Sequence, residues 1–465
     1  MIAGSPFRAD SLSPALLSRH SPPSLVRSML SSAIKLLTAC CISLLCAGNN
    51  LHSPALPSSK YDTDVAHHVF KERVSNIVVR NDITKGNRKQ HDDAHTVIFV
   101  IQQKNMDSLT KVLEDVSDPL SQNYGQHWTR EEVTAYTANP AGRDAVVSYL
   151  HNNNVKVIAE SLGGEYITAE AKISVWENMF KTEFYDFHHT HSDKRIETVT
   201  RSEEYSIPRE LNEHVSSVLK TVDMPIRSNN KQKNKKKQPT ELKHTELKSK
   251  NPKKGVLSAL IDGVMDPTRY RKTYNMSVST GGSTLSTQAI FSTNDAYYSP
   301  NDLKFYQNQY SSPIGGQPVS FQYGNRSSEI MCGIDPNNCG ESNLDLQLIM
   351  TMSPKSPTTF WYTDSFFSDW LVVVANTKNP PLVLSITYSC DEASLSSSTL
   401  NAFNTQAIKL GTMGVTIIVA SGDTGANSGD IADVSTCSYR PSFPGSSPYV
   451  LTVGATQVSK NQFQN

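Results

Sequence analysis

Residues 382–426 read LVLSITYSCDEASLSSSTLNAFNTQAIKLGTMGVTIIVASGDTGA, and this stretch indicates the fold class. Residues 382–388 and 415–420 are two continuous apolar runs rich in β-branched side chains, which is typical of strands buried on both faces. Between the runs, four apolar residues recur at helical spacing: Leu400, Phe403, Ala407 and Leu410. A strand, a helix and a second buried strand predict a parallel sheet with helices on both faces, and therefore an α/β fold.

The flanking sequence extends this interpretation into two domains. Residues 288–291 predict another strand, so we assign residues 256–465 to the C-terminal domain. Residues 95–226 alternate strand and helix patterns in a different order and predict a smaller α+β domain, with Thr129 and Glu132 forming a capping box at one helix start. Residues 49–94 are polar and lack periodicity, so we expect a loose extension there.

The N-terminus carries a pattern typical of a signal peptide. Residues 36–47 read LLTACCISLLCA, an apolar run that follows Arg27 and Lys35. Cys46 and Gly48 are small residues at positions suited to cleavage after Gly48, so we assign residues 1–48 to a signal peptide. Met29 is an alternative start, and a buried helix or a short anchor is the alternative structure. The run is shorter than the roughly 20 residues of a membrane span, so no stable span is expected.

Charge argues against a nucleic-acid partner. Lysine plus arginine and aspartate plus glutamate both number 44, so the whole chain is neutral. Residues 227–255 are locally basic, with Arg227 and ten lysines against Glu241 and Glu246. Because no aromatic side chain interleaves these lysines, a surface that stacks bases is not expected. The segment is interpreted as a solvated, protease-accessible linker.

Four cysteines lie beyond the apolar run: Cys332, Cys339, Cys390 and Cys437. An even number in a secreted chain predicts two disulfides. We favour a local Cys332–Cys339 bridge and a longer Cys390–Cys437 bridge, and two other pairings remain open. The sequons at Asn275 and Asn325 are candidate glycosylation sites in a secretory protein.

Three carboxyl groups are candidates for chemistry. Glu341 and Asp345 are four residues apart at the start of a predicted helix, so they share a helix face. Two close carboxyls repel each other when both are ionised and can share one proton, which suits acid–base catalysis at low pH. Asp423 follows the predicted strand 415–420 and, when protonated, could donate to a developing oxyanion. The alternatives are two solvated acids at a helix start and a structural turn aspartate.

Several separate segments together resemble the sedolisins, the serine-carboxyl peptidase family that includes kumamolisin and tripeptidyl-peptidase I. They occur in the family's order: VSDPLSQNYGQHWTREEV (116–133), SEEYSIPREL (202–211), QAIFSTNDAYYSPNDLKFY (288–306), ESNLDLQLIM (341–350), VTIIVASGDTGA (415–426) and FPGSSPYVLTVGAT (443–456). The resemblance implies a subtilisin-like parallel sheet preceded by an activation pro-domain over residues 95–226. It also implies that the basic linker is cut on activation and that the substrates are peptides or proteins.

The resemblance assigns roles to the three acids. Glu341 matches the general base, Asp345 matches the acid that orients it, and Asp423 matches the aspartate that stabilises the oxyanion. The family's serine lies in a Gly-Thr-Ser segment, which is absent from the 465 residues. Ser446 and Ser447 belong to a different matching segment and are not candidates for the nucleophile. The family's calcium is also expected, but its ligands match nothing in this sequence.

We therefore expect a C-terminally truncated, incomplete peptidase domain and an inactive chain. The protein is interpreted as the zymogen of an acid endopeptidase or tripeptidyl-peptidase, and the sequence does not decide between these two. The alternative is a pseudoenzyme whose pro-domain inhibits or chaperones an active relative. The expected location is the secretory pathway, leading to a lysosome, an acidic vacuole or the extracellular space.

One histidine cluster in the expected pro-domain has two interpretations. His188, His189 and His191 could sense acid, because protonation would charge a buried patch and help to release the pro-domain. The alternative is a set of exposed histidines in a hairpin.

Overall fold

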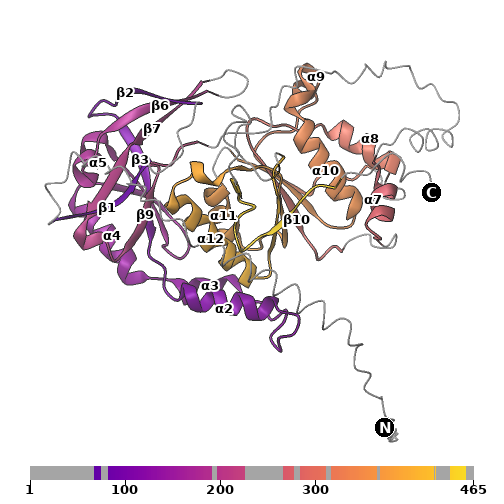
Figure 1. Cartoon of the computed structure of the whole chain (residues 1–465), viewed down its shortest axis with the longest axis horizontal. Helices are drawn as coiled ribbons and strands as arrows, with labels where there is room; N and C mark the ends of the chain where they lie inside the picture. The colour runs from indigo at the N-terminus through magenta and orange to yellow at the C-terminus, as the bar shows by residue number, and fades with distance from the viewer. Residues whose placement is uncertain are drawn as a thin grey trace, which may run out of the picture. The chain divides into compact units, whose positions relative to one another are not determined.

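The parallel sheet predicted from residues 382–426 is present in the computed structural model of the chain (Figure 1). Its described strands lie in the order β11-β12-β10-β13-β15-β17, and each neighbouring pair is parallel. The strands are β10 (Gln288–Ser292), β11 (Phe321–Tyr323), β12 (Thr358–Tyr362), β13 (Val383–Ile386), β15 (Thr416–Ala420) and β17 (Leu451–Val453). The α/β fold class is therefore confirmed.

The structure describes residues 67–74, 82–190, 196–225, 265–276, 283–310, 316–363, 367–423, 425 and 440–456. None of the helices in these ranges has the length and apolar character needed to cross a membrane. The predicted signal peptide and basic linker, together with Cys437 and His191, lie outside the described residues and stay predictions.

Helices cover both faces of the sheet because its strands are apolar on both faces. Along β10, Ala289 and Phe291 pack into one core with helices α11 (Phe367–Asn376) and α12 (Ser397–Thr412). The residue between them, Ile290, packs into a second core. That second core includes Leu303 of α8 (Pro300–Tyr310) and Leu346 of α10 (Gly340–Met352). The alternation follows from the two-residue period of a strand, which sends neighbouring side chains to opposite faces.

Shorter elements complete the C-terminal part. They are α7 (Pro267–Thr273), α9 (Glu329–Ile334), the 3-10 turns η4 (Pro336–Asn338) and η5 (Glu392–Ser394), and the antiparallel pair β14 (Cys390–Asp391) and β16 (Ser442–Phe443). The predicted Cys332–Cys339 disulfide is formed between α9 and the start of α10. Cys390 is buried on β14. The outer strand β17 is exposed, with 57% of Leu451 and 50% of Val453 accessible to solvent.

The N-terminal part is an α+β domain, as predicted. Its largest sheet is antiparallel with strand order β4-β5-β3-β9, formed by β3 (Ala94–Ile101), β4 (Lys156–Glu160), β5 (Tyr166–Lys172) and β9 (Val215–Leu219). Its helices are α2 (Met106–Ser117), α3 (Arg130–Thr137), α4 (Pro140–Asn152) and α5 (Ile173–Phe180), with the 3-10 turn η3 (Arg209–Leu211). The capping box of Thr129 and Glu132 at the start of α3 is confirmed.

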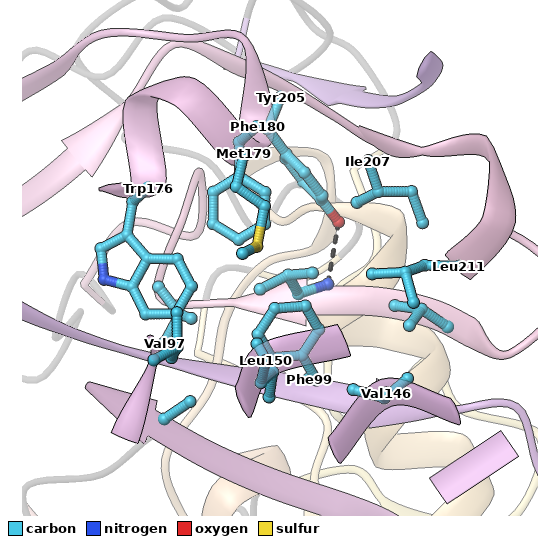
Figure 2. Packing of buried hydrophobic residues seen from close by; sticks show 14 of the residues in the cluster. Val97, Phe99, Val146, Leu150, Trp176, Met179, Phe180, Tyr205, Ile207 and Leu211 are labelled. Carbon is cyan, nitrogen blue, oxygen red and sulfur yellow. Dashed lines mark hydrogen bonds between the residues drawn. The ribbon is translucent and has the colours of Figure 1, made fainter. Parts of the chain in front are cut away.

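The core of this domain combines aliphatic side chains with five aromatic ones (Figure 2). The Trp176 and Phe180 rings on α5 stack with their centroids 5.4 Å apart, and Phe180 also contacts Phe99 of β3. The buried Tyr205 accepts a hydrogen bond on its hydroxyl from the Val218 backbone N–H at 3.0 Å. That bond ties the core to the edge strand β9 and satisfies a polar group that burial would otherwise penalise.

Two strands correct the expectation that residues 49–94 are a loose extension. β1 (His68–Arg73) pairs with β8 (Glu204–Pro208), and β2 (Ile83–Arg88) pairs with β6 (Phe184–Thr190). Both strands are largely polar, so they show no alternation of apolar residues in the sequence. Backbone pairing with strands about a hundred residues or more further along the chain defines them instead, so regular structure begins well before His95.

The expected histidine hairpin is formed by β6 and β7 (Ile196–Ser202). His188 is partly buried, with Nδ1 2.9 Å from the Thr198 hydroxyl. His189 is buried, and its Nε2 lies 3.1 Å from an oxygen of Asp82. The alternative of exposed histidines is therefore wrong for His189, and acid sensing by the cluster stays a prediction.

Helix α12 carries the main polar contacts between the two parts, which belong to one unit from Tyr61 onward. Lys409 Nζ lies 2.8 Å from Glu165 Oε1, and both side chains are about 95% buried, with 5% and 6% exposed. Gln406 donates to the Tyr166 hydroxyl at 3.1 Å. Burial acts to raise the pKa of Glu165, but the charge of Lys409 together with hydrogen bonds from Lys409, Ser161 and the backbone lowers it overall.

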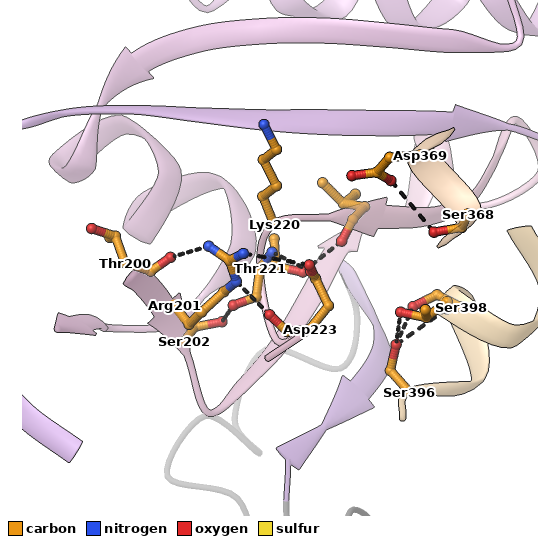
Figure 3. Close-up of polar contacts among 12 residues, drawn as sticks. Thr200, Arg201, Ser202, Lys220, Thr221, Asp223, Ser368, Asp369, Ser396 and Ser398 are labelled. Atoms are coloured by element: carbon orange, nitrogen blue, oxygen red, sulfur yellow. Dashed lines mark hydrogen bonds and ion pairs between the residues drawn. The ribbon is translucent and has the colours of Figure 1, made fainter. Parts of the chain in front are cut away.

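A second group of polar residues lies near the starts of α11 and α12 (Figure 3). Ser368 donates to Asp369 at 3.4 Å, and Lys220, Asp223 and Arg201 of the N-terminal part act on the Asp369 carboxyl. Burial and the nearby Asp223 charge raise the pKa of Asp369 to about 6, against the opposing influence of Lys220 and Arg201. Close by, the N–H and hydroxyl of Ser398 both donate to the carboxylate of Glu72.

Candidate functional site

Glu341 and Asp345 lie on the first two turns of α10, as the sequence predicts. Buried contacts fix the position of this helix start. The hydroxyls of Ser342 and Ser292 are 3.0 Å apart, which ties the helix to the carboxyl end of β10. The Asn343 side chain accepts from the backbone N–H of Ser299, at the start of α8, at 2.8 Å. The two acids are therefore held at the edge of the sheet where open α/β folds bind ligands.

The Glu341 and Asp345 carboxyls interact electrostatically. Burial and the neighbouring charge of Glu341 raise the pKa of Asp345 to about 8. Burial also raises the pKa of Glu341; a hydrogen bond with Thr387 opposes this rise, and the charge of Asp423 adds to it. Two such groups titrate as a pair, and at acidic pH they hold at least one proton between them. The pair can accept a proton from a substrate group or a nucleophile and later return it.

Asp423 is close enough to this pair to affect the titration of Glu341. It is exposed and follows the carboxyl end of β15, after Gly422 with φ of 90°. A β-carbon at position 422 would be 3.0 Å from the Ser442 hydroxyl, so glycine suits both the backbone conformation and the space. The structure thus brings together the three acids selected from the sequence. The oxyanion role of Asp423 stays a prediction.

Two residues that follow β13, Thr387 and Tyr388, were not predicted from the sequence. Thr387 donates its hydroxyl hydrogen to Asp345 Oδ2 at 2.9 Å. The neighbouring Tyr388 is buried and forms hydrogen bonds with the Ser292 side chain and the Thr293 backbone. Burial and the charges of Glu341 and Asp345 raise the pKa of Tyr388. One signal was available in the sequence, because Thr387 and Asp423 each come after one of two adjacent parallel strands, β13 and β15, whose carboxyl ends lie at the same sheet edge.

The remaining candidates are the two sequons and the calcium site implied by the resemblance. Asn275 and Asn325 are both exposed, as glycosylation would require. Within the described ranges, no group of three or more His, Cys, Asp or Glu side chains could hold a metal ion. The calcium implied by the resemblance is therefore not assigned to any residue.

Known proteins are similar to both parts of the chain. Residues 81–224 match the family described as Pro-kumamolisin, activation domain. Tripeptidyl-peptidase 1 of Dictyostelium discoideum is 30% identical over 406 residues, which cover 78% of this chain and 62% of that protein. Physarolisin of Physarum polycephalum is 27% identical over 401 residues, which cover 82% of this chain and 63% of that protein.

The chain therefore spans 62% and 63% of the length of these two curated relatives. Among solved structures, Pseudomonas sedolisin complexed with two molecules of pseudo-iodotyrostatin aligns with a TM-score of 0.32. That alignment has 21% sequence identity and covers 42% of this chain and 54% of the sedolisin chain.

Proposed function

Because the chain belongs to the sedolisin family of peptidases, we propose that it represents the zymogen of an acid-acting serine-carboxyl peptidase that hydrolyses peptide bonds. The observation that carries this proposal is the coupled pair of Glu341 and Asp345 at the carboxyl edge of the sheet, with Asp423 beside it. A site built from carboxyls works in acid, where part of the set keeps its protons.

In the proposed mechanism Glu341 takes the proton of a serine hydroxyl as that hydroxyl attacks the peptide carbonyl. Asp345, neutral below its raised pKa, orients Glu341. Asp423 donates to the oxyanion of the tetrahedral intermediate when it is protonated. Glu341 then returns the proton to the leaving amine, and the resulting acyl-enzyme is hydrolysed by water with the same groups.

The serine of this mechanism is not assigned among the 465 residues, which contain no Gly-Thr-Ser triplet. On this proposal these 465 residues lack the nucleophile and do not turn over substrate. A catalytically dead relative, with a pro-domain that inhibits or chaperones an active enzyme, is the alternative.

The N-terminal part is proposed to be the activation domain. Its match to the activation-domain family over residues 81–224 and its contacts with helix α12 support this role. Cleavage within residues 227–255 would release it. We also propose passage through the secretory pathway to a lysosome, an acidic vacuole or the exterior, with disulfides, glycosylation and a calcium site consistent with that route.

The test is a peptidase assay on the protein translated from the complete transcript, after incubation at pH 4. An internally quenched peptide with blocked ends and a tripeptide amide with a free N-terminus would separate endopeptidase from tripeptidyl-peptidase activity. Glu341→Gln and Asp345→Asn should each lower kcat at least 100-fold, while Lys378→Met, at an exposed position, should not. Full activity of Glu341→Gln would refute the mechanism, and a complete transcript without activity would favour the pseudoenzyme.

A further inference from the structure

The hydroxyl of Thr387 contacts both carboxyls of the proposed site. Thr387 directly follows the last residue of β13, Ile386, which pairs with Val419 of β15 in the sheet. Its hydroxyl oxygen lies 2.9 Å from Asp345 Oδ2, and a hydrogen bond between the same hydroxyl and Glu341 lowers the pKa of that carboxyl. One hydroxyl is therefore shared by two acids that come from a different element, α10.

A hydroxyl has one hydrogen to donate and lone pairs with which to accept. Between two carboxyls it can donate to the ionised one while it accepts from the protonated one. This arrangement is complete when the pair holds one proton. With no proton, the hydroxyl can donate to only one of the two carboxylates. With two protons, the charge-assisted bond, which is the stronger kind, is lost.

We propose that Thr387 is a positioning residue that bridges Glu341 and Asp345 and holds the pair in its singly protonated state. The inference rests on the proposed function, because that state is the one in which Asp345 can orient an ionised Glu341. Thr387 acts through the two acids and is not assigned a contact with substrate.

The other groups around the pair do not offset the repulsion between Glu341 and Asp345. The other charges that act on the pair come from Asp423, after β15, and from each other. Tyr388, next along the chain, directs its hydrogen bonds to Ser292 and Thr293. In the described part of the chain, no cation is among the groups that set the pKa of Glu341 or Asp345. A neutral hydroxyl is thus the group that offsets the repulsion between the two acids.

The test follows the protonation of each acid in the 465-residue chain. A water-soluble carbodiimide with glycinamide couples to carboxyls in their protonated form, and mass spectrometry of peptides reports modification at Glu341 and Asp345 separately. In the wild type, the pH profiles of the two sites should fall in two well-separated steps. Thr387→Val should bring the steps together by about one pH unit, because the singly protonated pair loses both a charge-assisted and a neutral hydrogen bond.

Thr387→Ser keeps the hydroxyl and should restore the wild-type separation. Thr416→Val, at the start of the adjacent strand β15, controls for loss of a hydroxyl elsewhere in the sheet. Thermal unfolding of each variant shows whether it is folded. Profiles for Thr387→Val that match the wild type would overturn the proposal, as would profiles for Thr387→Ser that match Thr387→Val. The measurement needs no peptidase activity, so its failure is distinct from failure of the proposed mechanism.

Discussion

The protonation of Asp345 links the site to the stability of the fold. Its pKa is raised to about 8 by burial and by Glu341, far above the value of about 4 for an unfolded aspartate. A group with a raised pKa contributes stability that is fully present below the unfolded value and is lost as the pH rises through the folded value. The buried Asp345 carboxyl therefore lowers the stability of the native state at neutral and alkaline pH, where it must ionise.

Asp345→Asn should remove that penalty. The amide cannot ionise, so the variant should gain stability relative to the wild type between pH 5 and pH 8, by on the order of 2 kcal/mol or more. Urea midpoints at the two pH values measure the gain. Asp107→Asn, at an exposed position of α2, is the matched control and should show no such trend. If the urea midpoints of both variants changed equally between the two pH values, the Asp345 carboxyl would not be protonated in the folded protein.

For single residues, the sequence predicted the two acids of the site but not Thr387, which hydrogen-bonds them. The spacing of Glu341 and Asp345 placed both on one helix face without any knowledge of the fold. Thr387 carries no such local pattern, because its role depends on which strand lies beside α10 and on how far that strand extends. Only the register of β13 against β10 and β15 brings the hydroxyl to the acids.

Helix α12 shows why element predictions succeed and where they stop. Its apolar residues at helical spacing predict the helix and the face that packs on the sheet. The structure buries the opposite side as well, including Lys409, which is 4% exposed. The partner that makes this burial tolerable, Glu165, lies 244 residues earlier in the chain. No pattern within the helix identifies such a partner, just as no local pattern identifies the polar strands β1 and β2.

Removal of one member of this ion pair should be costly. Lys409→Met leaves Glu165 as a buried, uncompensated charge and should lower the free energy of unfolding by about 3–5 kcal/mol. The double variant Lys409→Met with Glu165→Gln should recover most of that loss. Lys378→Met, at an exposed position, is the control. The pair would be shown to be unimportant if urea unfolding gave the same loss for Lys409→Met and Lys378→Met.

Across the whole molecule, the carboxyls between the two parts respond to pH in opposite directions. The pKa of Glu165 is lowered. Its contribution to stability is therefore present above about pH 4.3, the usual pKa of glutamate, and is lost as the pH falls through the pKa in the folded protein. Asp369 has a pKa raised to about 6, so its contribution is present in acid and is lost as the pH rises through 6. The pKa of Glu72 is raised by burial, in the same direction as that of Asp369.

The two parts should therefore hold together most strongly between about pH 4.5 and pH 6. After limited trypsin cleavage in the lysine-rich residues 227–255, they should co-elute in gel filtration within this window and separate below it. Asp369→Asn should extend co-elution toward neutral pH, while Lys378→Met should leave the window unchanged. Co-elution that does not depend on pH would show that apolar contacts, and not these carboxyls, govern the association.

The outer strand of the parallel sheet affects how the protein behaves in concentrated solution. Among the described residues, β17 presents Leu451 and Val453 to solvent beside an outer row of backbone groups that β15 does not bond, which is a template for pairing with another chain. Such a template promotes aggregation, so the protein should lose solubility as its concentration rises. Leu451→Lys should raise the concentration at which light scattering begins, with an unchanged circular dichroism spectrum. In a bacterial expression host, the fraction of Leu451→Lys protein in the soluble lysate should therefore exceed that of the wild type.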